Sequence, residues 1–442
     1  MASNELMSRR KFIERGAGAT AAAAAVAYGS TATAYAQKAR NVRAGVASAS
    51  FTYDLWSFDN PTGVKQLKQI VDAYNQHATT KVDFNISTLS GSGATLYPSK
   101  IQSLISSGHA PDLFSNWVGT LAQPFVAEGS VQSLKPWYEK YGWDKILIPA
   151  ATEYVTFNGE PYEVPFGVVT MAVWYNKKLF AKAGVQPPKT YAEWETVNTR
   201  LKKAGIIPLA QGVIDGWDIM RLFEHLLEMT AGPALHDNLL ALKHSWDVPA
   251  VEQAFSLLAQ WAQKGWLEPG FLGTNPTDAG DLFTGLKAAM SIQGQGEQLQ
   301  FATSGLPESM FGIFVPPLMT SASPRLGGFA MGYMVGSHVT GPKLSALGEF
   351  FNWFIQPAVS RKYQYDGLTP SKGGVQTSSA LAVESAAITT SHGAYLIQDE
   401  ALGTALANAF FSIQASVLAG HMTPKAAAAA MQAAVGKHKK ND

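Results

Sequence analysis

Apolar and polar residues follow strand spacing in two early segments and helical spacing between them. Residues 42–51 and 81–88 fit half-buried strands, and the second alternates Val82, Phe84 and Ile86 with polar neighbours. The segment between them carries an apolar stripe at intervals of three and four residues, formed by Val64, Leu67, Ile70, Val71 and Tyr74. This pattern predicts a strand, a helix and a second strand in succession.

Further helices are marked by their ends and by their apolar faces. A helix around Ile101 is expected to end at Gly108, and Thr190 with Glu193 forms a capping box that starts another. Apolar stripes predict more helices within residues 251–262, 344–354 and 401–435, the last stretch restarting at Pro424, and place three tryptophans in the core: Trp194, Trp261 and Trp353. Strand–helix units of about 30 residues predict an α/β fold with a mostly parallel sheet.

Composition excludes several classes of protein. The chain has 442 residues, 46% of them hydrophobic and 15% charged, which fits two or three globular domains rather than a disordered chain. A formal net charge of +1 provides no electrostatic ground for binding nucleic acid. The absence of Cys excludes disulfides, thiolate catalysis and Cys-ligated zinc. The nine His have no metal-ligand spacing, so we expect no metal site and no cofactor.

Residues 1–36 have the pattern of an export signal. Arg9 and Arg10 precede the apolar pair Phe12-Ile13, as in twin-arginine signals, and a Gly/Ala-rich segment leads to a small-x-small cleavage site ending at Ala36. A membrane anchor is the alternative, but glycines and threonines dilute the segment below the hydrophobicity of a membrane span. We expect cleavage near Ala36 and a periplasmic product without a membrane span.

Catalytic motifs are not supported by the spacing of the candidate residues. Several carboxylates are available for glycoside hydrolysis, but none has a fixed-spacing partner. Residues 90–93 read Ser-Gly-Ser-Gly, which lacks the nucleophile pattern Gly-x-Ser-x-Gly and the Lys-Ser/Thr of a phosphate loop. The basic end at residues 437–440 suits a solvated helix terminus. We therefore expect a protein that is not an enzyme.

Seven segments in chain order resemble the solute-binding proteins of bacterial ABC importers, the maltose-binding-like sugar-binding group. Two of the segments match specific sequence signatures of that group. Residues 174–180 read Trp-Tyr-Asn-Lys-Lys-Leu-Phe, and residues 183–194 contain Gly-Val-Gln-Pro-Pro-Lys-Thr-Tyr-Ala-Glu-Trp. The others are weaker alone and lie at residues 107–114, 158–165, 287–294, 326–328 and 420–425. Together they are spread across nearly the whole chain after the export signal.

The resemblance implies a two-lobed periplasmic-binding-protein fold. Each lobe would be a mostly parallel sheet flanked by helices, with three hinge crossings near residues 165–166, 316–326 and 368–371. Lobe 1 would then comprise residues 37–165 and 327–368, and lobe 2 residues 166–326 and 369–442. The expected function is capture of a mono- or short oligosaccharide between the lobes and its delivery to permease subunits in the inner membrane, by a monomer.

Sugar recognition requires aromatic faces for C–H groups and planar polar side chains for hydroxyls. Loop positions of these types, several of them matching the family's ligand-contacting segments, are Trp56, Asp59, Asn116, Trp117, Phe166, Asp215, Trp217, Asp218, Gln293, Gln295 and Phe329. Each also has a structural interpretation, as a core aromatic or as a helix cap, and the sequence leaves both open.

One departure from the family bears on the ligand. Many relatives carry Gly-x-Trp after the strand that ends near Met290, whereas this chain has Gly294-Gln295-Gly296. Losing that aromatic platform favours a smaller or more polar solute than a maltose-like oligosaccharide. A non-sugar solute, such as a polyamine or a phosphorylated polyol, remains the alternative; Arg221 and Arg325 are the candidates for a phosphate group.

Overall fold

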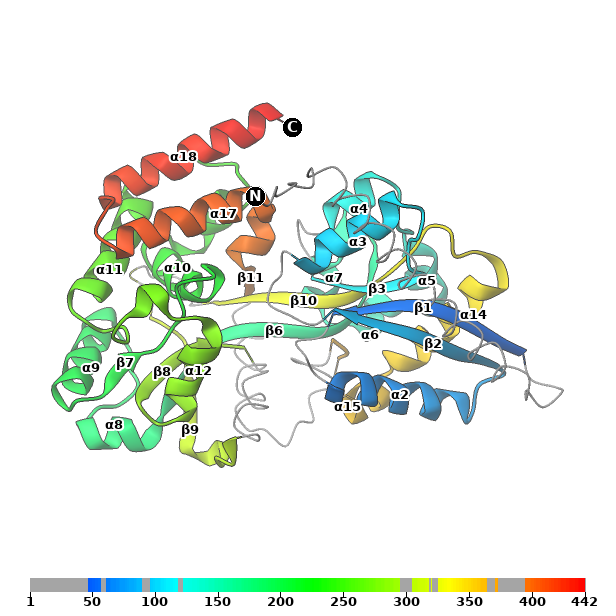
Figure 1. Ribbon diagram of the computed structural model, residues 1–442, viewed down its shortest axis with the longest axis horizontal. Coiled ribbons are helices and arrows are strands. Elements are labelled where there is room, and N and C mark those ends of the chain that lie inside the picture. Colours follow the sequence, from blue (N-terminus) through cyan, green and yellow to red (C-terminus); the bar gives the residue numbers. More distant parts are fainter. Residues whose placement is uncertain are drawn as a thin grey trace, which may run out of the picture. The chain divides into compact units, whose positions relative to one another are not determined.

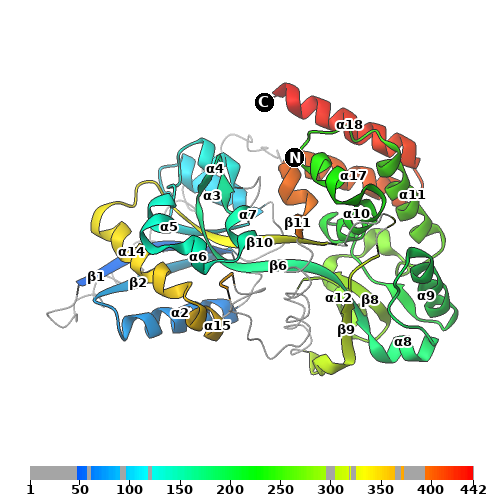
Figure 2. The same ribbon diagram turned by 180° about the vertical axis from the view of Figure 1, so that it is seen from behind.

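Two long strands carry almost uninterrupted apolar sequence. β6 (Glu163–Asn176) and β10 (Leu326–Val335) are buried at nearly every position, as expected for strands covered on both faces. They pair antiparallel, from Gly327 opposite Met171 to Met334 opposite Glu163, and run side by side in both views (Figures 1 and 2). The register shifts between Met331 and Gly332, so Phe166 is the extra residue of a β-bulge.

The computed structural model describes residues 47–56, 61–89, 96–117, 122–294, 304–317, 319, 325–363, 370–372 and 394–441. The chain divides into two compact units, residues 1–48 with 79–81 and residues 49–78 with 82–442. Of the described residues, only 47–48 and 79–81 belong to the first unit. The predicted export signal lies outside the described residues.

The sheet is mixed. Its strand order is β2-β1-β3-β10-β6-β8-β7, with β11 added to β10 and β9 added to β6. The pairs β1/β3, β7/β8 and β10/β11 are parallel, whereas β6 and β10 run antiparallel to their other neighbours. The expectation of mostly parallel sheets is therefore wrong in this respect. The bounds are β1 (Ala47–Trp56), β2 (Thr80–Leu89), β3 (Leu113–Trp117), β7 (Ile207–Leu209), β8 (Ala288–Gln293), β9 (Phe311–Phe314) and β11 (Ala394–Leu396); a separate hairpin joins β4 (Thr156–Phe157) and β5 (Glu160–Pro161).

Two contact groups stand out among the described helices. α10, α11, α17 and α18 pack on one another, while α14 packs on α2 and α15. These groups are found near different ends of β6 and β10 (Figures 1 and 2). The helices are α2 (Pro61–Asn75), α3 (Leu96–Ser106), α4 (Gln123–Ala127), α5 (Lys135–Tyr141), α6 (Trp143–Ile146), α7 (Pro149–Tyr154), α8 (Lys177–Ala183), α9 (Tyr191–Lys203), α10 (Trp217–Leu240), α11 (Pro249–Gln263), α12 (Pro276–Thr284), α14 (Gly341–Phe354), α15 (Pro357–Lys362), α17 (Gln398–Leu418) and α18 (Pro424–Asn441).

Most local predictions are confirmed. The predicted helices and the strand at residues 81–88 are present. The first strand is described over Ala47–Trp56, which overlaps the prediction at residues 47–51, and residues 42–46 lie outside the described residues. Thr190 caps α9, since its Oγ1 accepts a hydrogen bond from the Glu193 backbone N–H at 3.2 Å. The Glu193 carboxylate reaches back to the N–H of Lys189, one residue before the cap, at 2.7 Å. Both partners of the predicted box therefore stabilise the start of α9.

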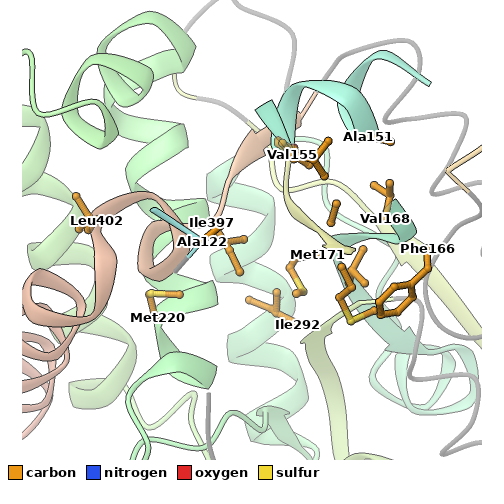
Figure 3. Packing of buried hydrophobic residues seen from close by; sticks show 14 of the residues in the cluster. Ala122, Ala151, Val155, Phe166, Val168, Met171, Met220, Ile292, Ile397 and Leu402 are labelled. Carbon is orange, nitrogen blue, oxygen red and sulfur yellow. The ribbon is translucent and has the colours of Figure 1, made fainter. Parts of the chain in front are cut away.

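Most of the core belongs to one large cluster that is rich in aromatic residues. Trp194 and Trp261 are fully buried and meet edge to face, with ring centroids 5.1 Å apart. Trp353 is partly buried and packs against Tyr74. Figure 3 shows part of this core, where Met171 of β6 lies between Ile292 of β8 and the ring of Phe166.

Among the described helices, α17 alone is long and apolar enough to cross a membrane, by length and composition only. Here it packs against α10, α11 and α18, so its apolar residues have partners within the chain.

Candidate functional site

The start of α10 differs from the predicted Gly-bounded loop. The helix begins at Trp217, so Trp217 and Asp218 lie in its first turn, while Asp215 stays in the preceding loop and is exposed. Gly216 forms the N-cap with a φ of +78°, and a Cβ there would run into the ring of Phe411. Glycine is thus required by both backbone conformation and space, and it fixes how Trp217 enters the helix.

Asp218 is a buried hydrogen-bond centre. Its Oδ2 accepts the Gly212 N–H at 2.6 Å, and its Oδ1 accepts the side-chain amides of Gln211 at 2.6 Å and Gln293 at 3.2 Å. The Arg221 guanidinium lies 3.4 Å from the same Oδ1. Burial raises the pKa of Asp218 to about 6, although Arg221 and these hydrogen bonds oppose the shift. Because its oxygens are engaged by the chain, Asp218 positions its neighbours.

Trp217, Arg221 and Gln293 form one aromatic and polar cluster around that carboxylate. The Arg221 guanidinium stacks over the Trp217 ring, 4.4 Å from the centroid, and donates to Gln293 Oε1 at 2.5 Å. Trp217 and Gln293 are half-buried and so remain partly accessible. Three predicted ligand residues, Trp217, Asp218 and Gln293, are therefore brought together from α10 and β8.

Gln211 is a contributor that sequence reasoning missed. Its side chain also bonds the backbone of Ile292, accepting from the N–H at 3.0 Å and donating to the carbonyl at 3.1 Å. It thereby ties the residues after β7 to both β8 and α10. A polar residue two positions after a strand was the available signal, since ligand sites of α/β sheets form at strand ends.

Asn116, Phe166 and Phe329 lie on the long strands and their neighbour β3. Asn116 stands opposite Gly332 and donates through Nδ2 to Oε1 of the fully buried Glu163 at 3.1 Å. Phe166 is 6% exposed, and its ring centroid lies 4.5 Å from that of Tyr333. Phe329 is half-buried in β10, opposite Val169.

Four predicted residues are described incompletely or not at all. Asp59 and Gln295 lie outside the described residues. Trp56 ends β1 and Trp117 ends β3, where Trp117 stands opposite Met331 in the sheet; only their backbone is described.

Buried carboxyl groups dominate the electrostatics beside this cluster. Burial and the neighbouring Asp399 raise the pKa of Glu224 well above its ordinary value, and one of its oxygens accepts the backbone N–H of Gln398. Burial likewise raises the pKa of Asp399 to about 6 against the opposing charge of Arg221. The pKa of Glu400 is also raised, mainly by burial and further by the nearby carboxyl groups of Asp399 and Glu163. In the described part of the chain, no group of three acidic or His side chains has metal-binding geometry.

This architecture, a mixed sheet whose two long strands join two groups of helices, is that of a two-lobed binding protein. The model of the bacterial extracellular solute-binding protein family matches residues 58–360, and the chain belongs to that family. The predicted resemblance is thereby confirmed.

Curated relatives match over part of their length. A probable sugar-binding periplasmic protein of Mesorhizobium japonicum is 26% identical over 149 residues, 34% of this chain and 35% of the relative. The sn-glycerol-3-phosphate-binding periplasmic protein of Brucella abortus is 25% identical over 260 residues, 55% of this chain and 58% of the relative. The chain thus spans roughly a third to a little over half of these relatives.

Solved structures match over most of the chain. A chitin oligosaccharide binding protein has a TM-score of 0.77 at 22% identity, covering 88% of this chain and 98% of that structure. A structure from work on xylan utilization by Caldanaerobius polysaccharolyticus has a TM-score of 0.75 at 23% identity, covering 87% and 99%. At these identities the likeness concerns the fold, and it confirms the predicted two-lobed α/β class.

Proposed function

We propose that this protein captures a mono- or short oligosaccharide in a cleft between its lobes and delivers it to an ABC-type importer. Family membership supports a binding protein, and the names of several relatives and structural neighbours refer to sugars. In this proposal the protein acts as a monomer and releases its solute chemically unchanged, so it is not an enzyme and uses no cofactor.

The observation that carries this proposal is the cluster at the start of α10. Trp217 offers a ring that is already oriented by Arg221, and Gln293 is held in place by Asp218. An aromatic face beside directional hydrogen-bonding groups matches the amphipathic surface of a pyranose. The residues proposed to line the cleft are Trp56, Asp59, Asn116, Trp117, Phe166, Asp215, Trp217, Asp218, Gln293, Gln295 and Phe329, with Asp218 acting as a positioning residue.

Closure of the lobes is part of the proposal. Residues 37–165 with 327–368 form lobe 1, and residues 166–326 with 369–442 form lobe 2. In support, β6 pairs with β10 through Met171 and with β8 from Ala172 onward, so one strand exchanges partners along its length. A sugar that contacts both lobes favours the closed state, because only that state completes its contacts.

Export sets where this function is performed. A twin-arginine signal at residues 1–36, cleaved near Ala36, would deliver the protein to the periplasm, where permease subunits of the inner membrane are its partners. Family membership among extracellular proteins supports export in general. Mass spectrometry of the N-terminus of the exported protein would test the cleavage site.

A polyamine is the second candidate, and a phosphorylated polyol is disfavoured. Both arginines that might hold a phosphate are engaged by carboxylates: Arg221 by Asp218, and Arg325 by Glu228 and Asp237. Asp218 and Asp399 interact with Arg221, and with pKa values raised only to about 6 both are mostly ionised at neutral pH. Their two negative charges against one positive charge suit a cationic solute better than an anionic one.

The test is a thermal-shift screen of residues 37–442, followed by calorimetry. Probes are galactose, xylobiose, chitobiose, laminaribiose, spermidine and glycerol 3-phosphate. A ligand at about 100 times its dissociation constant adds about 2.7 kcal/mol of stability. If a sugar stabilises the protein and is recovered chemically unchanged, the proposal is supported. If spermidine alone stabilises the protein, the solute is instead a polyamine, the second candidate.

Two tryptophan variants then test the site. Trp217→Ala should weaken sugar binding by about tenfold or more, because a stacked ring contributes roughly 1 kcal/mol beyond the area it buries. Trp353→Ala is the matched control, since Trp353 is also half-buried but packs against Tyr74 and Phe350. Equal affinity in both variants would contradict the assignment of Trp217.

A further inference from the structure

Two basic segments far apart in the sequence meet at the end of α18. Lys439 Nζ donates to the backbone carbonyl of Leu242 at 2.6 Å. The same helix also binds the segment that follows Leu242, because Gln432 Oε1 accepts hydrogen bonds from the N–H of Trp246 at 2.7 Å and the hydroxyl of Ser245 at 3.1 Å. These contacts place Lys243 and His244 beside the last turns of α18, which ends in Figure 1 at the label C.

The resulting surface, here called the basic patch, consists of Lys243, His244, Lys437, Lys439 and Lys440, and all five are exposed. In the described chain, none of its lysines forms an ion pair. Other lysines are paired, for example Lys264 with Glu195 at 2.8 Å and Lys343 with Asp112 at 2.8 Å. The acids nearest in sequence are Asp247 and Asp442.

The charge is local. The whole chain carries 34 basic against 33 acidic residues, so the basic patch does not reflect a general excess of positive charge. The capping of the α18 dipole accounts for basic residues in its last turn. It does not account for Lys243 and His244, which the fold brings to the same place from the end of α10.

We propose that the basic patch is a docking surface for anionic phospholipid headgroups. Clustered, exposed lysines that form no ion pair in the described chain suit a fluid anionic surface, which needs charge density rather than a shaped pocket. Each lysine close to such a surface strengthens binding about fivefold, so four lysines produce weak, reversible and salt-sensitive attachment. A protein that carries solute to a membrane permease would then search along the membrane surface.

The experiment is co-sedimentation of residues 37–442 with vesicles of equal parts phosphatidylglycerol and phosphatidylcholine, or of phosphatidylcholine alone. The triple variant Lys243→Gln, Lys437→Gln and Lys440→Gln leaves the Lys439 contact intact. The matched control neutralises three exposed lysines elsewhere, Lys65, Lys68 and Lys203. Circular dichroism melts verify that both variants remain folded.

The wild type should sediment with the anionic vesicles at low salt and dissociate at about 0.3 M salt. The triple variant should lose on the order of 100-fold in vesicle affinity, and the control much less. Absence of wild-type binding, or equal losses in both variants, would overturn the proposal. Binding of single-stranded DNA as tight as binding of the vesicles would also overturn the proposal, because the basic patch would then bind polyanions in general. None of these results depends on whether the protein binds a sugar.

Discussion

Glu163 offers the sharpest test of the buried electrostatics. Its carboxyl group is fully buried at the start of β6, where Oε1 accepts one hydrogen bond from Asn116, and burial raises its pKa from 4.5 to about 8. A shift of that size corresponds to about 5 kcal/mol between the two protonation states. At neutral pH the folded protein therefore holds Glu163 mostly in its protonated form.

The direction of the pH dependence follows from the raised pKa. The folded state holds a proton that the unfolded state releases above about pH 4.5, so the contribution of Glu163 is complete below that pH. It is lost at up to about 1.4 kcal/mol per pH unit as the pH rises toward 8. Glu163→Gln mimics the protonated acid and keeps the acceptor for Asn116, so the variant should lose this part of the dependence.

Urea unfolding of the wild type and the variant between about pH 5 and pH 8 measures the effect. The difference in unfolding free energy should grow in favour of the variant by several kcal/mol across this range, on the order of the shift itself. Glu139→Gln, an exposed position on α5, is the control and should leave the pH profile unchanged. Parallel profiles for wild type and Glu163→Gln would refute the reasoning.

Substitutions at three further positions test local features by thermal and urea unfolding. Gly216→Ala should cost roughly 2 kcal/mol or more, because alanine meets both a positive φ and the Phe411 ring; an unchanged melting temperature would contradict that close approach. Arg325→Gln should cost about 3–5 kcal/mol, since the buried Glu228 loses its cation; a loss below about 1 kcal/mol would show that water or His236 replaces it. Thr190→Ala should cost about 1 kcal/mol through loss of the α9 cap, and Thr190→Ser should restore most of it.

Local sequence patterns determined much of this protein. Apolar periodicity and caps located α2, α3, α9 and α11 because these signals act within a few residues. Short motifs in chain order indicated the family, and the match of its model to residues 58–360 confirms it. Trp194 and Trp261 were recognisable as core residues from their place on helical stripes.

The tertiary structure decided how distant residues combine. The direction of β6 and β10 could not be read from runs of apolar residues, because a buried strand shows no alternation and carries no record of its partner. Asp218 resembled a ligand or a cap in sequence, and only folding brought Gln211 and Gln293 to its oxygens. The sequence around Glu163 does not indicate an unusual pKa. Burial in the folded protein raises that pKa, and the hydrogen bond from Asn116 opposes the rise. Periodicity reports whether a residue is buried, whereas hydrogen-bond partners and desolvation depend on contacts between residues far apart in the chain.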